Sequence, residues 1–185
     1  MKKILLLAVL VLTVFSVTAQ ENIDTKEKNT TKNFNEVKLN GLFLVLGALE
    51  ITYERTLNEE SAVGMSFFLP IDEEIKDDIN YYISPYYRMY FGKKYAAGFF
   101  VEGFGLLSSI KDYESRFTTG PDPLFITEEK NSTDFALGIG LGGKWITNSG
   151  FIGELNAGIG RNVINNDENS DDLVGKIGVS IGYRF

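Results

Sequence analysis

Residues 173–185, LVGKIGVSIGYRF, decide the fold class. Their odd positions are apolar or glycine and end in two aromatic residues, whereas most even positions are small, polar or cationic. A period-2 pattern of this length predicts a tilted β-strand that can cross a membrane, which takes about 9–11 residues. The strand closes on Phe185. The pattern therefore predicts a small membrane β-barrel, and it favours a structural or binding role at a cell surface over catalysis.

Residues 1–19 have the features of a secretory signal peptide. Lys2 and Lys3 precede an apolar run over 4–17, and small residues precede a predicted cleavage site at Gln20. The run is short for a membrane-spanning helix, so an uncleaved anchor is the less favoured alternative. Residues 20–35 are polar and lack periodicity, which predicts a flexible periplasmic arm. Residues 36–185 are expected to form the barrel domain.

The composition excludes several classes of function. The chain has 185 residues and a formal net charge of −7, which argues against nucleic acid as a partner. It contains no cysteine and no histidine, so disulfides and metal sites built on these residues are excluded. No cofactor is expected.

Seven more strands are predicted before the last one, and their connections alternate in length. The predicted strands are 36–47, 48–57, 61–70, 80–91, 97–110, 133–147 and 150–163. The links 58–60, 92–95 and 148–149 are short, whereas 71–79, 111–132 and 164–172 are long. Outer-membrane barrels show this alternation, with short periplasmic turns and longer outer loops. The link at 47–48 is an exception because it is very tight for an outer loop.

Aromatic residues gather at the predicted periplasmic ends of the strands, which indicates an interfacial girdle. They are Tyr53, Phe91, Tyr95, Phe99, Trp145, Phe151, Tyr183 and Phe185.

At this point the chain resembles the small eight-stranded outer-membrane barrels of the OmpA/OmpX kind, and more closely an uncharacterised barrel family of Gram-negative bacteria. The resemblance rests on the stretches LEITYER (49–55), SPYYRMYF (84–91), FFVEG (99–103) and GYRF (182–185). It implies an all-β, antiparallel, up-and-down transmembrane barrel in the cell outer membrane. It also implies that the closing strand carries the signal read by the barrel-insertion machinery, with Ile177, Val179, Ile181, Tyr183 and Phe185 at the alternate positions.

Charged residues share the predicted inward face of the strands. They are Lys38, Glu54, Arg88, Glu102, Lys144, Glu154, Lys176 and Arg184, with Glu50 and Asp134 as further candidates. Charges at membrane depth must face the interior and be paired, and an eight-stranded barrel is just wide enough for side chains to fill it. We therefore predict a buried ion-pair network and a filled, non-porin interior; an ion pathway or proton relay is the alternative.

The long predicted loops are acidic, which is typical of a solvated surface. Asp167, Glu168, Asp171 and Asp172 offer oxygen ligands for a hard divalent cation, although they do not have the spacing of an EF-hand loop. Leu124, Phe125 and Ile126 are apolar on an otherwise acidic loop, and they either pack back over the barrel mouth or contact a partner.

Three functions follow from these observations. The leading hypothesis is a non-enzymatic outer-membrane barrel with a structural or surface-interaction role, in contact with outer-membrane lipid and lipopolysaccharide; any extracellular partner is unknown. The second is a lipid-modifying barrel enzyme in which Glu102 activates water, since no histidine base is present for Ser108 or Ser109. The third is a soluble periplasmic barrel that binds a small apolar ligand.

Overall fold

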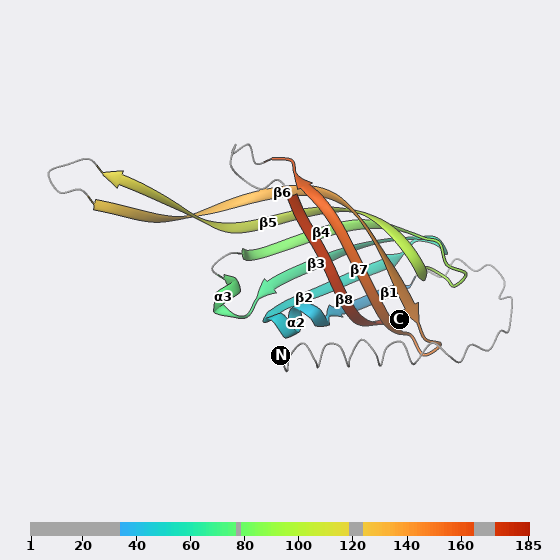
Figure 1. Cartoon of the computed structure of the whole chain (residues 1–185). Coiled ribbons are helices and arrows are strands. Elements are labelled where there is room, and N and C mark those ends of the chain that lie inside the picture. Colours follow the sequence, from blue (N-terminus) through green and yellow to red (C-terminus); the bar gives the residue numbers. More distant parts are fainter. Residues whose placement is uncertain (1–33, 77–78, 119–123, 165–172) are drawn as a thin grey trace. The chain divides into compact units, whose positions relative to one another are not determined.

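The computed structural model describes residues 34–76, 79–118, 124–164 and 173–185. Within them, eight antiparallel strands form one closed barrel in which every strand pairs with its sequence neighbours and the last strand pairs with the first (Figure 1). The strands are β1 (Asn35–Asn40), β2 (Ala48–Thr56), β3 (Ser61–Pro70), β4 (Ile79–Tyr90), β5 (Gly98–Thr118), β6 (Leu124–Ile146), β7 (Phe151–Asn162) and β8 (Leu173–Arg184). The predicted fold class is confirmed.

The barrel has two different ends. The backbone N–H of Asn35 donates to the carbonyl of Phe185 (3.0 Å), so β1 begins where β8 ends. The links 57–60, 91–97 and 147–150 lie at this end, which we call the short-turn end. The opposite end, called the long-loop end, holds the helices α2 (Gly41–Leu46) and α3 (Glu73–Lys76), the β5–β6 hairpin and the β7–β8 link.

Side chains alternate between a polar interior and an apolar outer wall. Ile139, Phe151, Ile181 and Phe185 are each 60–70% exposed, and similar residues cover the outside of every strand. A soluble protein rarely exposes so large an apolar surface. A closed ring of strands also satisfies the backbone hydrogen bonds that lipid cannot satisfy. The barrel therefore has the surface of a transmembrane protein.

The prediction of strand one was wrong beyond Asn40, because residues 41–46 form the short helix α2. The side chain of Asn40 caps the helix by accepting from the N–H of Leu42 (3.1 Å), and Gly47 ends it in a left-handed conformation (φ 94°). Both are strong local helix boundaries. The run between them, GLFLVL, is apolar at every position after the glycine, so it carries no inward and outward alternation that would hold it as a strand. The connection between the first two strands is therefore residues 41–47, which include the helix, and not the very tight link predicted at 47–48.

The prediction of a loop over 111–132 was also wrong. Both strands continue beyond the barrel as a two-stranded ribbon, with pairing from Ile110 opposite Ser132 to Thr118 opposite Leu124 (Figure 1). Polar sequence is compatible with such a ribbon because neither of its faces is covered by the barrel. The backbone at 124–126 belongs to this ribbon and pairs with 116–118.

Other expectations fall on residues outside the described ranges, including the signal peptide and nearly all of the periplasmic arm. No helix in the described residues has the length and apolar character that a membrane-spanning helix needs.

Asn40 has a second role that makes it a test of the α2 geometry. Its Oδ1 accepts the N–H of Val179 (3.2 Å), and its Nδ2 donates to the carbonyl of Ile177 (3.4 Å). The side chain thus takes the place of a neighbouring strand at β8, where β1 has already ended.

We expect Asn40→Ala to lower the free energy of unfolding by about 2 kcal/mol, because it removes the helix cap and leaves strand groups unpaired. Urea unfolding of the refolded barrel in detergent measures the change. Asn148→Ala, in an exposed turn, is the matched control and should stay within about 0.5 kcal/mol of wild type. Equal effects of the two substitutions would contradict this role of Asn40.

Candidate functional site

The centre of the barrel is organised around the carboxylate of Glu54, which is fully buried. Its Oε1 accepts the hydroxyl of Tyr90 (2.7 Å) and the ammonium of Lys144 (2.6 Å). Its Oε2 accepts Lys38 Nζ (2.7 Å), the Tyr86 hydroxyl (2.7 Å) and Arg88 Nη1 (3.0 Å). Five donors from β1, β4 and β6 therefore meet on one side chain of β2.

A second carboxylate, Glu154 of β7, completes this centre from the other side of the barrel. Its Oε2 accepts Lys38 Nζ (2.7 Å) and Arg88 Nη1 (2.8 Å). Lys38 and Arg88 each lie between Glu54 and Glu154, and all four residues are at most 3% exposed. Because each cation has at least two anions and each anion at least two cations, the charges compensate one another.

The network continues toward the long-loop end through Glu102. Its Oε2 accepts Arg88 Nε (2.7 Å), and its Oε1 accepts Lys176 Nζ (2.9 Å). Toward the short-turn end, Lys144 also donates to both oxygens of Glu36 (3.1 and 2.9 Å). A connected chain of charges thus extends along the barrel interior.

Aromatic rings fill the space between the charges. The Arg88 guanidinium lies 4.2 Å from the ring centres of both Tyr86 and Phe100. Lys144 lies 4.3 Å from the ring centre of Tyr90, a distance at which a cation is attracted to the ring face. The rings come from β4 and β5, so the interior is filled mainly from one side.

Glycines on the adjacent strand β6, and on β7 beyond it, leave room for these rings. A Cβ atom at Gly142 would run into the ring of Phe100, and one at Gly138 or Gly158 would run into the ring of Phe104. The glycine-rich inward positions of β6 and β7 are therefore explained by packing.

The short-turn end is closed by the link between β4 and β5. Arg184 donates from Nε to Glu36 (2.8 Å), and from Nη1 and Nη2 to the carbonyls of Tyr95 and Ala96 (both 2.9 Å). Ala96 is fully buried and has a positive φ of 42°, which costs a non-glycine residue roughly 1 kcal/mol. Its N–H donates to the carbonyl of Glu59 (2.7 Å), so the link is held from two sides.

One member of the predicted aromatic girdle lies elsewhere. Tyr95 turns inward and contacts Phe34 edge-on (ring centres 5.5 Å apart), so its assignment to the outer girdle was wrong. The other seven aromatic residues are exposed on the outer wall.

The structure brings all eight predicted interior charges into this network. Sequence reasoning missed three of its members, namely Glu36, Tyr86 and Tyr90. Glu36 lies on the same face of its strand as Lys38, and Tyr86 and Tyr90 lie on the same face as Arg88. The alternating pattern could therefore have identified all three as inward-facing. Of the two further candidates, Glu50 is buried and accepts Asn40 Nδ2. Asp134 is buried near the long-loop end, where it accepts Ser132 Oγ (3.4 Å).

The remaining predicted sites lie away from the network. Ile177, Ile181, Tyr183 and Phe185 of the predicted insertion signal are exposed on the outer wall, and Val179, on the same face, is partly exposed. The predicted metal ligands Asp167, Glu168, Asp171 and Asp172 lie outside the described residues. Among the residues that are described, no group of three or more acidic side chains is placed to hold a metal ion.

Comparison with solved structures agrees with this architecture. The chain superimposes on the N-terminal β-barrel domain of Pseudomonas aeruginosa OprF with a TM-score of 0.52 and 12% sequence identity, covering 83% of this chain and 96% of that one. Neisserial surface protein A matches at a TM-score of 0.39 and 13% identity, over 82% of this chain and 94% of that one. No protein-family model and no curated protein matches the chain. By fold, the chain is a closed, eight-stranded antiparallel β-barrel like that domain.

We expect Glu54→Gln to lower the free energy of unfolding by about 3–5 kcal/mol, because it leaves Lys38, Arg88 and Lys144 short of negative charge in a buried site. Glu59→Gln, in an exposed turn, is the control and should change stability by less than about 0.5 kcal/mol. Urea unfolding followed by the shift in electrophoretic mobility of the folded barrel measures both. A loss below about 1 kcal/mol would show that Glu54 is not the centre of the network.

Proposed function

We propose that this protein is an integral outer-membrane barrel with a structural or surface-interaction role, whose interior is closed and conducts no solutes. The observation that carries the proposal is the continuous buried network around Glu54, which joins strands on opposite sides of the barrel. A transport channel needs a water-filled path along its axis. Here the axis is occupied by paired charges and aromatic rings.

Membrane insertion is supported by the outer wall. Apolar side chains cover it, and Tyr53, Phe91, Phe99, Trp145 and Phe151 surround its short-turn end. Aromatic side chains are favoured at the membrane interface. A soluble periplasmic barrel would have to expose the same surface to water, which argues against the third hypothesis of a soluble binder.

The partners that fit this surface are membrane components. Outer-membrane lipid, including lipopolysaccharide, contacts the apolar wall. The barrel-insertion machinery is expected to recognise the alternating apolar positions of β8, which are exposed on the outer wall.

The enzymatic alternative has weak support. Both oxygens of Glu102 accept hydrogen bonds from cations, Arg88 and Lys176, so this carboxylate is poorly suited to take a proton from water. Ser108 and Ser109 are buried near the long-loop end. Activity that modifies lipid tails in cells, lost in a Glu102→Gln variant of normal stability, would reverse this conclusion.

Cysteine labelling tests the location and the orientation, since the chain has no cysteine of its own. We expect Ile164→Cys, exposed at the long-loop end, to react with a membrane-impermeant maleimide on intact cells. Ser149→Cys, in a short turn, should react only after lysis, because that end faces the periplasm. Labelling of neither residue in intact cells, with release of the protein by osmotic shock, would show that the barrel is soluble.

Liposome swelling tests the closed interior. Vesicles that contain the refolded barrel should not swell in an isotonic solution of a small sugar, because ion pairs and rings occupy the axis. Vesicles with a known porin provide the positive control. Swelling at a comparable rate per inserted barrel would contradict a closed interior, even if the labelling experiment succeeds.

A further inference from the structure

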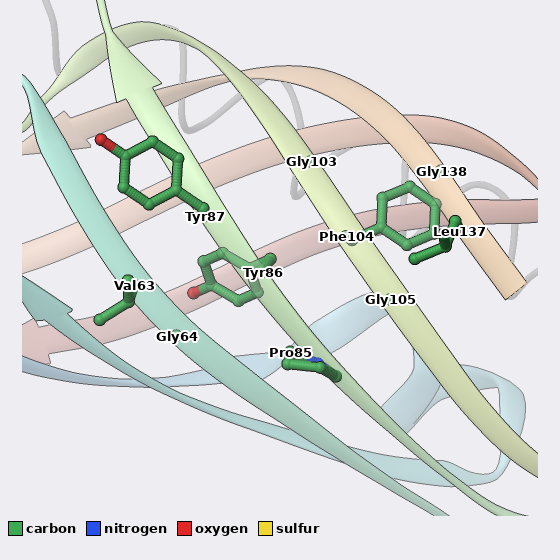
Figure 2. A pocket seen from close by; sticks show the side chains of 10 residues that line it. All are labelled: Val63, Gly64, Pro85, Tyr86, Tyr87, Gly103, Phe104, Gly105, Leu137 and Gly138. Carbon is green, nitrogen blue, oxygen red and sulfur yellow. The ribbon is translucent and has the colours of Figure 1, made fainter. Parts of the chain in front are cut away.

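The outer wall carries two neighbouring grooves, separated by Leu137. The first has a volume of about 540 Å³ and crosses β3 to β6 (Figure 2). Its outward-facing lining is Val63, Pro85, Tyr87, Gly103, Gly105 and Leu137. The second has a volume of about 500 Å³ and lies over β6 to β8, where its outward-facing lining is Leu137, Ile139, Ile159, Arg161 and Leu173. Both grooves are shallow and open to the outside of the barrel.

The first groove forms where glycines leave the outer wall without side chains and where a short stretch of β4 and β5 is unpaired. A Cβ atom at Gly103 would meet nothing within 4 Å, so the space outside it is open. The β4–β5 pairing is interrupted between the pairs Ile83–Leu107 and Tyr86–Phe104. Pro85 lies in this interval and has no N–H to donate. The Ser84 hydroxyl donates to the carbonyl of Gly105 instead (2.8 Å).

The strand register gives the direction of the first groove. Leu137 pairs with Arg161 on one side and Gly105 on the other, while Gly103 pairs with Tyr87, which pairs with Val63. Arg161 lies next to the last residue of β7 at the long-loop end, whereas Val63 lies near the first residue of β3 at the short-turn end. The groove therefore runs obliquely across the apolar wall, from Leu137, which pairs with Arg161, to Val63 near the short-turn end.

One cation lies where the two grooves approach the long-loop end. Arg161 is on the outward face of β7, is exposed, and lines the second groove. It also takes part in an interaction within the chain. A guanidinium has five N–H donors, and a phosphate can share them with a partner in the protein. Arginine binds phosphate in a geometry that gives strong, charge-assisted hydrogen bonds.

We propose that the two grooves and Arg161 form a binding site for one phosphate-bearing membrane lipid with at least two acyl chains. The acyl chains lie in the grooves on either side of Leu137, and the phosphate binds Arg161. Apolar linings on a lipid-facing wall suit acyl chains, and the position of the cation at the long-loop end selects a lipid of the outer leaflet. This site depends on the membrane location and orientation proposed above, which cysteine labelling tests separately.

The test uses native mass spectrometry of the refolded full barrel in a neutral detergent. The two probes are dipalmitoyl phosphatidic acid and dipalmitoylglycerol, which share their acyl chains and differ in the phosphate. We expect wild type to bind one molecule of phosphatidic acid about tenfold more tightly than dipalmitoylglycerol. That is the fold-change that follows from one additional charge-assisted hydrogen bond.

Two pairs of variants separate the parts of the site. Gly103→Leu fills the first groove, and Gly153→Leu is its control, because a Cβ at either position meets nothing within 4 Å and Gly153 lines neither groove. Arg161→Gln removes the phosphate ligand, and Arg55→Gln is its control, since Arg55 is exposed on the outer wall at the short-turn end. Gly103→Leu and Arg161→Gln should each weaken phosphatidic acid binding about tenfold, while both controls stay within about twofold.

The mobility shift of the folded barrel confirms that each variant is folded. If the two leucine variants bind alike, or if Arg161→Gln binds as wild type does, the proposed site is wrong. A loss caused by Arg55→Gln instead of Arg161→Gln would place the lipid in the opposite leaflet and would also overturn the proposal. None of these results would affect the proposed location if the labelling experiment gives the expected pattern.

Discussion

The barrel depends on the complete compensation of one buried carboxylate. Glu54 has no contact with solvent, and it accepts donors from three other strands. Moving a charge out of water costs several kcal/mol, and only well-placed counter-charges and hydrogen bonds return that energy. Because no strand supplies the donors alone, the centre forms only when β1, β2, β4 and β6 have closed into a ring. The network thus ties the chemistry of the interior to the closure of the barrel.

The same packing accounts for the outer grooves. An eight-stranded barrel has room for one layer of side chains, and here that layer comes mainly from the rings of β4 and β5. Tyr86 and Phe104 reach across only because their neighbours Gly64 and Gly138 have no side chain. Gly103 and Gly105 add to this thin part of the wall, where Pro85 interrupts the ladder. The strands β4 and β5 therefore supply both the rings that fill the interior and the thin part of the wall that forms the first groove.

Much of the fold could be predicted because a period-2 pattern assigns every residue to one of two faces. The method failed where the pattern is absent. Residues 41–46 are apolar without alternation, so the local signals of Asn40 and Gly47 decided the structure. The β5–β6 ribbon was missed because a ribbon with no covered face needs no apolar alternation.

The membership of the network could be predicted in the same way, but its pairing could not. Parity placed Lys144 inside, whereas its bond to Glu36 joins residues 108 positions apart. That pairing depends on the stagger of strands around the whole ring, which no local pattern contains.

A charged interior also explains which face of each strand turns toward the inside of the barrel. Lipid is as apolar as a leucine core, so in a bilayer an apolar interior would give the strands little reason to turn one face inward. A slip of one residue in a strand moves every side chain to the other face. For β2 this slip would place Glu50 and Glu54 in hydrocarbon, where unpaired charges are strongly disfavoured. The ion network therefore need not add much stability over an apolar core to be useful, since it also penalises every slip that turns the charged face toward lipid.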